Sequence, residues 1–239
     1  MVSKNMKKIF EVTALACLMA VASNAMAIGP SANVQVKGTV KMGACTPTLD
    51  NGGIVDYGDI SSDVLNQNSN QLAHKYINLT ITCTTATKLE WYAMDNRIGS
   101  AFGGNITDAG MDGSTQDVGA GNNQMGLGKT TGDVKIGAYV VAVQVPQVSV
   151  DGSTTAYDAV KRANTTVWSV SSLGLLGNGS DTGSTVYYSI ADKGTAAPVP
   201  FTTAVFPLKI SAALNNRENL ALNDVVSIDG NNTFTINYI

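Results

Sequence analysis

Cysteine and histidine are the residue types in this chain with the greatest capacity for metal binding or nucleophilic chemistry. The 239 residues contain three cysteines, Cys17, Cys45 and Cys83, and one histidine, His74. A zinc site needs about four Cys, His or carboxylate ligands, and a single imidazole supplies too few. His74 stands in a polar stretch without a Gly-x-Ser-x-Gly turn, so we interpret it as a surface residue. The sequence therefore predicts no catalytic residues, no metal site and no cofactor.

Two polar motifs match ligand sites only in part. Residues 123–130 end in Gly-Lys-Thr, as a phosphate-binding loop does, but Asn123 replaces the first glycine and a strand pattern follows in place of a helix. Asp108, Asp112 and Asp117 lack the alternation and terminal Glu of a helix-loop-helix calcium site, and we interpret them as a solvated acidic loop. Carboxylate pairs of the glycosidase type are assembled by the fold and not by spacing, so a periplasmic hydrolase stays an alternative without any motif in its favour.

The N-terminal residues have the order of a secretory signal peptide. A basic stretch from Lys4 to Lys8 precedes an apolar run from Ile9 to Ala22, and Ala25-Met26-Ala27 supplies small residues for cleavage. The apolar run is too short to span a bilayer. We therefore expect residues 1–27 to be removed and the protein to be exported to the periplasm. A lipid attached to Cys17 is the alternative, although Ala stands where Leu is expected three residues before it.

The predicted mature chain, residues 28–239, is mildly acidic. Removing the signal peptide takes away three of the 15 basic and one of the 18 acidic side chains, which leaves a net charge of about −5. This balance offers no broad basic surface for nucleic acid or anionic membranes. The length fits one β domain.

Two cysteines remain in the mature chain, and we expect them to form a disulfide. Cys45 and Cys83 would be paired in an oxidising compartment. Closing this loop should stabilise the fold by roughly 4 kcal/mol. Alternation from Ile77 onwards puts Cys83 on the buried face, beside Cys45.

Short strands with period-two alternation, separated by turn residues, predict an all-β sandwich of one domain. The expected strands are Val34–Met42, Tyr76–Cys83, Leu89–Met94, Lys135–Val145, Thr165–Val170, Thr185–Ile190, Ala204–Ala213, Asp224–Ile228 and Thr233–Tyr238. Residues 101–132 and 173–183 are rich in Gly, Asn, Asp and Ser, and we expect long loops that bury too little surface to order themselves well. Trp91 and Trp168 are expected to be packing residues, with a sugar-stacking role as the alternative.

The two ends of the mature chain alternate most regularly. The N-terminal strand would place Val34, Val36, Gly38, Val40 and Met42 on one face, and the C-terminal strand would place Phe234, Ile236 and Tyr238 on one face. The simplest interpretation of the first segment is an ordinary first strand of the sandwich.

Together these features resemble the pilins of chaperone–usher fimbriae. The resemblance rests on the alternating segment with Gly38, the pair Cys45 and Cys83, and the penultimate Tyr238. Further stretches resemble the DUF1120 family of fimbrial-like proteins, and the resemblance covers nearly the whole mature chain: Cys45-Thr46-Pro47-Thr48-Leu49, Asp95-Asn96-Arg97, Gly126-Leu127-Gly128 and Lys135-Ile136-Gly137. The chain departs from the pilins in having Val226 where a glycine is usual and in its greater length.

The resemblance implies an immunoglobulin-like pilin sandwich that lacks its last strand. A periplasmic chaperone would first lend a strand at the edge marked by Phe234, Ile236 and Tyr238, and the segment 28–44 of a neighbouring fimbrial subunit would then replace it at an outer-membrane usher. Gly38 would be the small residue where donor and groove pass closely. The implied function is that of a structural subunit of a cell-surface fimbrium. The alternative is a fimbrial adhesin or carbohydrate-binding module that uses the long polar loops, with a receptor on a host as its partner.

Overall fold

The computed structural model describes residues 31–40, 43–180, 185–221 and 225–239. The chain divides into two units, Met1–Lys41 and Met42–Ile239, and each is described by itself. The predicted signal peptide, residues 1–27, lies outside the described residues, as do Lys41 and Met42 of the predicted first strand.

Residues 31–40, the described part of the first unit, have no regular secondary structure. The side chains of Val34, Val36 and Val40 are 89%, 93% and 101% exposed. The expectation of a strand over Val34–Met42, and the interpretation of it as an ordinary first strand of the sandwich, are therefore wrong for residues 34–40 of the single chain. Alternation alone does not make a strand, because the backbone gains its ladder hydrogen bonds only from a partner strand.

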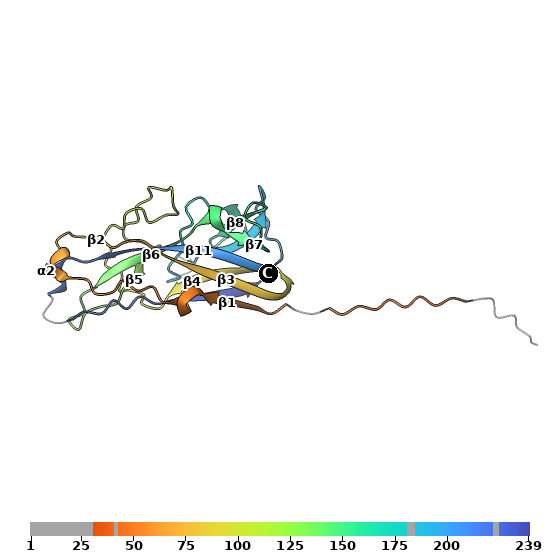
Figure 1. Cartoon of the computed structure of the whole chain (residues 1–239), viewed down its shortest axis with the longest axis horizontal. Coiled ribbons are helices and arrows are strands. Elements are labelled where there is room, and N and C mark those ends of the chain that lie inside the picture. Colours follow the sequence, from red (N-terminus) through yellow and green to blue (C-terminus); the bar gives the residue numbers. More distant parts are fainter. Residues whose placement is uncertain (1–30, 41–42, 181–184, 222–224) are drawn as a thin grey trace, which may run out of the picture. The chain divides into compact units, whose positions relative to one another are not determined.

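The second unit contains two β-sheets, which confirms the all-β sandwich (Figure 1). The first sheet has the order β1-β3-β11-β6-β5, with β2 and β7 also paired to β11. Its strands are β1 (Cys45–Leu49), β2 (Asn70–Gln71), β3 (Lys75–Thr87), β5 (Met125–Gly126), β6 (Gly137–Val143), β7 (Ser149–Val150) and β11 (Phe201–Leu214).

The second sheet has the order β12-β4-β10-β8-β9, and every pairing that joins neighbours in it is antiparallel. Its strands are β4 (Leu89–Asp95), β8 (Tyr157–Arg162), β9 (Ser169–Val170), β10 (Tyr187–Asp192) and β12 (Asn232–Tyr238). The short helical elements of the described chain are η1 (Asp50–Gly53), η2 (Ser62–Val64), η3 (Val145–Gln147) and α2 (Arg217–Leu220).

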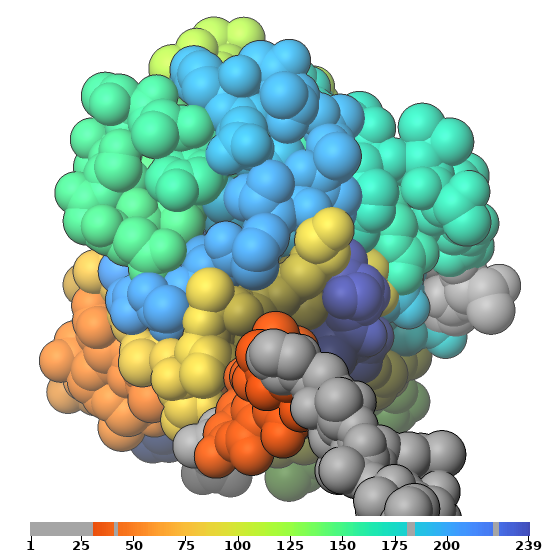
Figure 2. Space-filling model, turned by 90° about the vertical axis from the view of Figure 1, so that its right-hand side faces the viewer, coloured from red at the N-terminus to blue at the C-terminus, as the bar shows by residue number. Residues whose placement is uncertain are grey.

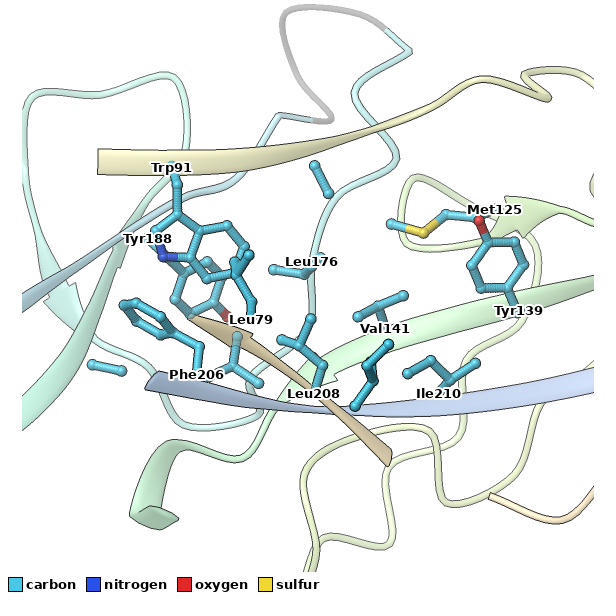
Figure 3. Close-up of a cluster of buried hydrophobic side chains, with 14 of the residues drawn as sticks. Leu79, Trp91, Met125, Tyr139, Val141, Leu176, Tyr188, Phe206, Leu208 and Ile210 are labelled. Atoms are coloured by element: carbon cyan, nitrogen blue, oxygen red, sulfur yellow. The ribbon is translucent and has the colours of Figure 1, made fainter. Parts of the chain in front are cut away.

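An aromatic cluster between the two sheets forms the centre of the core (Figure 3). Trp91 stacks on Tyr188 with ring centroids 5.3 Å apart and meets Phe206 edge-on at 5.0 Å. All three side chains are fully buried. Such aromatic pairs add about 0.5–1.5 kcal/mol beyond their burial. Trp91 is thus a packing residue, as expected, and its burial removes it from any sugar-stacking surface.

The long polar region after residue 101 is ordered by a small apolar cluster of its own. Ile106, Ala109 and Val118 are buried against Ala138 and Ala213, on the face of the first sheet that points away from the main core. Backbone hydrogen bonds of 2.9 Å join Ile106 and Val118 in both directions. The expectation that residues 101–132 cannot order themselves is therefore wrong, because a few small apolar side chains suffice to attach the region to the sheet.

Most expected strands are present with shifted ends, and two expectations fail in the second unit. Residues 225–228 contain no strand, and of Thr165–Val170 only the last two residues form β9. Neither β8, which precedes that segment, nor β1 was predicted from the pattern of residues. Pro47 interrupts the strand pattern within β1, so this strand was not predicted, although proline is compatible with an edge strand.

Candidate strand-binding groove

The outer strands β1 and β12 form the two rims of an opening between the sheets. β1 pairs only with β3, and β12 pairs only with β4, so that among the described strands each has one edge without a partner. The two rims meet at one end, where the backbone N–H of Cys45 donates a hydrogen bond of 3.0 Å to the hydroxyl of Tyr238. Figure 2 shows this end of the unit, with the C-terminal residues in dark blue beside the β3–β4 turn in yellow; there the N–H of Ile239 donates to the carbonyl of Lys88.

A disulfide between Cys45 and Cys83 fixes the β1 rim, which confirms the predicted pair. The two residues are directly opposite each other in the β1–β3 ladder, with their Cα atoms 4.0 Å apart. Cys83 belongs to the buried core, and Cys45 packs against that core from the edge. The disulfide therefore holds an edge strand of only five residues onto the sheet.

A cavity of about 210 Å³, lined mainly by apolar side chains, lies between the rims. Side chains from both sheets line it, among them Leu49, Ile77, Val141, Leu208, Ile210 and Phe234. Figure 3 shows Val141, Leu208 and Ile210 next to one another on β6 and β11. The cavity is therefore suited to apolar side chains that enter from the edge of the sandwich.

The groove continues into a wider cavity of about 840 Å³ toward α2. Both cavities are lined by Val55, Tyr57 and Ile228, so they adjoin. The walls of the wider cavity come mainly from the segment 55–65, which follows β1 and η1, and from residues 225–228, which precede β12, with Ile136, Leu214 and Leu220 completing them. Among the described residues, the charged ones that line it are Asp56 and Asp59.

Tyr57 stands where the two cavities join. Its hydroxyl oxygen is buried and has no hydrogen-bond partner among the described residues. Burial raises the pKa of Tyr57 to about 12, because the phenolate would be poorly solvated there. A buried hydroxyl without a partner costs about 1–3 kcal/mol, so a carbonyl or amide that reached it would stabilise the protein.

Gly230 closes the inner wall of the smaller cavity. A Cβ at this position would lie 2.9 Å from the Tyr139 ring and 3.0 Å from Leu127. The hydroxyl of Tyr139 donates to the side-chain oxygen of Asn232 at 2.7 Å, and burial raises the Tyr139 pKa. The glycine thus permits the segment before β12 to approach the first sheet.

The family-like stretches around Asp95, Gly126 and Gly137 meet at one structural junction. The Asp95 carboxylate accepts hydrogen bonds from the backbone N–H groups of Arg97 and Gly126, at 2.8 and 2.9 Å. Burial raises the Asp95 pKa, and these hydrogen bonds oppose the rise. A Cβ at Gly137 would lie 2.4 Å from the backbone oxygen of Ala213. These stretches therefore have a structural role: Asp95 holds the end of β4 next to β5, and Gly137 lets β6 approach β11 closely.

Arg97 of this junction also holds the segment that leads to β12. Its guanidinium forms an ion pair of 2.7 Å with Asp229, which raises the Arg97 pKa through the hydrogen bond and the attraction of the carboxylate. Both side chains are substantially exposed, so water and salt screen the pair and its contribution to stability is small.

His74 is half-buried, so the interpretation of it as a surface residue is corrected. Its Nδ1 lies 3.0 Å from the Oγ of Ser211, which is fully buried on β11. Burial lowers the His74 pKa, as does the charge of Lys209, while Asp108 and Asp112 oppose the effect. Because Ser211 is fully buried, its hydroxyl is not accessible to a substrate in this structure, although it lies next to a histidine.

The acidic loop is tied to the sheet rather than fully solvated. Asp112 forms an ion pair of 3.1 Å with the buried Lys209 and accepts a hydrogen bond from Tyr76. No group of three or more His, Cys, Asp or Glu side chains among the described residues is placed to hold a metal ion. Residues 123–130 include β5 and no helix.

Trp168 packs on the outer side of the second sheet. The Arg162 guanidinium lies between it and Tyr187, 5.5 Å and 4.1 Å from the two ring centroids. Glu90, which is buried, holds Arg162 by two hydrogen bonds of 2.8 and 2.6 Å. The guanidinium thus covers one face of each ring, which supports the packing role expected of Trp168.

No helix within the described part of the chain has the length and apolarity required to cross a bilayer.

Comparison with known proteins places the chain in a family. A family model described as "Protein of unknown function (DUF1120)" matches residues 34–140. The chain is similar to "Uncharacterized protein YhcF" of Escherichia coli (strain K12), with 30% identity over 87% of this chain and 90% of the relative. It is also similar to "Protein GltF" of the same organism, with 30% identity over 94% of this chain and 95% of the relative. These matches extend over nearly the full length of both relatives, and the chain therefore belongs to the DUF1120 family.

Proposed function

We propose that this protein is a structural subunit of a cell-surface fimbrium and performs no catalysis. The groove between β1 and β12 accepts a β-strand from another polypeptide, and residues 34–42 serve as the strand that the protein lends in turn. Strand addition of this kind gives affinity through backbone hydrogen bonds and specificity through pockets for alternate side chains.

The observation that carries the proposal is that one chain contains both a groove that could accept a β-strand and an alternating segment that is not itself paired in a strand. An apolar groove lies between two strands whose outer edges are unpaired among the described residues. Residues 31–40 lack secondary structure although Val34, Val36, Gly38 and Val40 alternate with polar residues. An exposed edge favours uncontrolled association, so a partner that covers it would protect the protein.

The C-terminal strand supplies the acceptor edge in this proposal. Phe234 lines the smaller cavity, and Phe234 and Ile236 are partly buried against the core. The incoming strand would hydrogen-bond to the free edge of β12 and place apolar side chains next to Leu49 and Phe234. A periplasmic chaperone would occupy the same edge first, and assembly at an outer-membrane usher would follow export of the chain.

The decisive experiment removes the donor segment and leaves the acceptor groove intact. Purified mature protein and a variant lacking residues 28–42 are compared by size-exclusion chromatography with light scattering, alone and mixed. We expect the mature protein to form multimers, the deletion variant to remain monomeric, and a peptide of residues 34–42 to bind the variant. The length-matched control Val36→Lys/Val40→Lys keeps the segment but removes its apolar face, and it should also fail to assemble.

Two results would contradict the proposal. One is an assembly state that is unchanged by the deletion. The other is a mature monomer in which amide hydrogen exchange shows residues 34–42 protected within their own chain. In cells, co-purification of the deletion variant with a periplasmic chaperone, without attachment to neighbouring subunits, is the expected counterpart.

A further inference from the structure

We propose that Asp56 and Asp59 form an acidic rim that recognises Lys37 and Lys41 of the segment lent by a second copy of this chain. This inference rests on the proposed function and specifies what the groove selects. The occupant is a second copy because the chain itself contains an apolar strand with basic residues on its polar face.

The carboxylates of this acidic rim form no ion pair with the described residues, although the Lys75 ammonium lies 5.7 Å from the ring centroid of the neighbouring Tyr57. Asp56 and Asp59 are exposed, and they are the charged residues within the described part of the chain that line the wider cavity. The Asp56 carboxylate accepts one hydrogen bond, from the backbone N–H of Gly58 at 2.8 Å. The nearby Asp63 differs, because Arg217 pairs with it at 3.1 Å. Neither rim carboxylate forms an ion pair within the described residues, so two negative charges are left at the mouth of an apolar groove.

The donor segment carries the complementary charges. Lys37 and Lys41 are its charged residues, and both occupy the polar positions of the alternation. When the apolar side chains point into the groove, the two ammonium groups point to its rim. Four residues of strand separate them by roughly 13 Å, so Lys41 and Lys37 would lie one after the other along the rim.

The charges also favour one direction of binding. The groove is closed at one end by the contact between Tyr238 and Cys45, and the uncharged part of the segment around Val34 suits this end. The opposite end of the groove has the acidic rim, which suits Lys41. β12 runs from Asn232, next to the wider cavity, to Tyr238. The bound segment therefore runs antiparallel to β12. The body of the donor copy then lies beyond the wider cavity, which permits head-to-tail growth.

The test measures binding of a fluorescent peptide of residues 34–42 to the deletion variant that lacks residues 28–42, by anisotropy at low and high salt. Replacing both rim carboxylates (Asp56→Asn/Asp59→Asn) should weaken binding by about threefold to tenfold at low salt. Reversing them (Asp56→Lys/Asp59→Lys) should weaken it further, and a peptide with Lys37→Glu and Lys41→Glu should recover affinity for that reversed rim. In about 1 M salt, screening of the charges should make the peptide affinities of the variants nearly equal.

A matched control changes the same charge elsewhere: Asp133→Asn/Asp192→Asn removes two exposed carboxylates that do not line the groove. It should bind the peptide as the unmodified body does. If the rim variants bind the peptide at low salt as tightly as the protein that keeps Asp56 and Asp59, the inference is overturned and the proposed function still stands. Absence of any peptide binding would instead overturn the proposed function.

The direction is tested separately with a photo-reactive residue at either end of the peptide. A probe at position 42 should crosslink to residues 55–60, and a probe at position 34 should crosslink near Cys45 or Tyr238. The reverse pattern would contradict the inferred direction.

Discussion

The hydroxyl of Tyr238 accepts a hydrogen bond of 3.0 Å from the backbone nitrogen of Cys45, 193 residues earlier in the chain. This contact joins the last strand of one sheet to the first strand of the other. Because Cys45 is also linked to Cys83, the rims of the groove are held together at one end by a hydrogen bond and a disulfide in succession. The groove is thus bounded at this end and widens toward α2.

Removing the Tyr238 hydroxyl should loosen that end of the groove. We expect Tyr238→Phe to lower the free energy of unfolding by about 0.5–1.5 kcal/mol, because one intramolecular hydrogen bond is lost. Urea denaturation measures the change. Tyr92→Phe is the matched control, since the Tyr92 hydroxyl makes no hydrogen bond to the described residues, and a similar loss in both variants would contradict a specific role for Tyr238.

Removing the disulfide should have a larger effect. Cys45→Ala/Cys83→Ala should lower the free energy of unfolding by roughly 4 kcal/mol, since the unfolded chain regains the entropy of a 38-residue loop. Thermal and urea unfolding measure the loss. When the unmodified protein is unfolded without reductant, a thiol reagent should detect no free cysteine at positions 45 and 83. Detection of a full equivalent of free Cys45 would contradict the disulfide.

The two tryptophans should respond differently to truncation. Trp91→Ala removes a fully buried ring and should cost about 3–5 kcal/mol. Trp168→Ala removes a contact with Arg162 and should cost about 0.5–1 kcal/mol. Urea denaturation of both variants checks this order, and equal losses would mean that Trp168 packs more deeply than the structure indicates.

The glycine at the start of β6 should tolerate no side chain. In Gly137→Ala the new methyl group would meet the backbone oxygen of Ala213, which cannot move without breaking the β6–β11 ladder. We expect a loss of about 1–3 kcal/mol. Gly119→Ala is the control, because nothing lies within 4 Å of its added Cβ, and it should be close to neutral.

The pH dependence of stability should contain a contribution from Asp158. Its pKa is lowered by the backbone N–H of Gly194 and by Lys193, both of which donate at 2.8 Å. Asp158 therefore contributes stability above the unfolded pKa of about 3.9, and this contribution is lost as pH falls through the lower folded pKa. Asp158→Asn should destabilise the protein by about 1–2 kcal/mol at pH 7 and progressively less below pH ~4. A difference that persisted at pH ~2 would exclude this origin.

How much of this could be predicted from the sequence depended on where the stabilising partner lies. β3 and β11 could be predicted because their own residues alternate and face the core. β1 could not, because Pro47 interrupts the pattern and its strand conformation depends on pairing with β3. Residues 34–40 alternate equally well but are not a strand, since none of the described strands pairs with them.

The groove was predictable in part for the same reason. The resemblance pointed to Phe234, Ile236 and Tyr238, and these residues lie in β12, which pairs only with β4 among the described strands; their role as a binding edge stays a prediction. The acidic rim of the wider cavity could not be predicted, because Asp56 and Asp59 stand in an irregular segment whose place is set by contacts far away in the sequence. Likewise, the half-buried state of His74 depends on Ser211, and local polarity gave no sign of it.

The central position of β11 sets the order in which the protein acquires its shape. β11 ends at Leu214 and pairs with β3, β6, β2 and β7, all of which are synthesised before it. Until this late segment has emerged, β3 and β6 have no neighbour between them, and long-range pairing of this kind is slow. Newly made chains therefore pass through a period in which their apolar strands are open to proteases and to aggregation, and a holding protein that acts early would raise the yield of folded molecules.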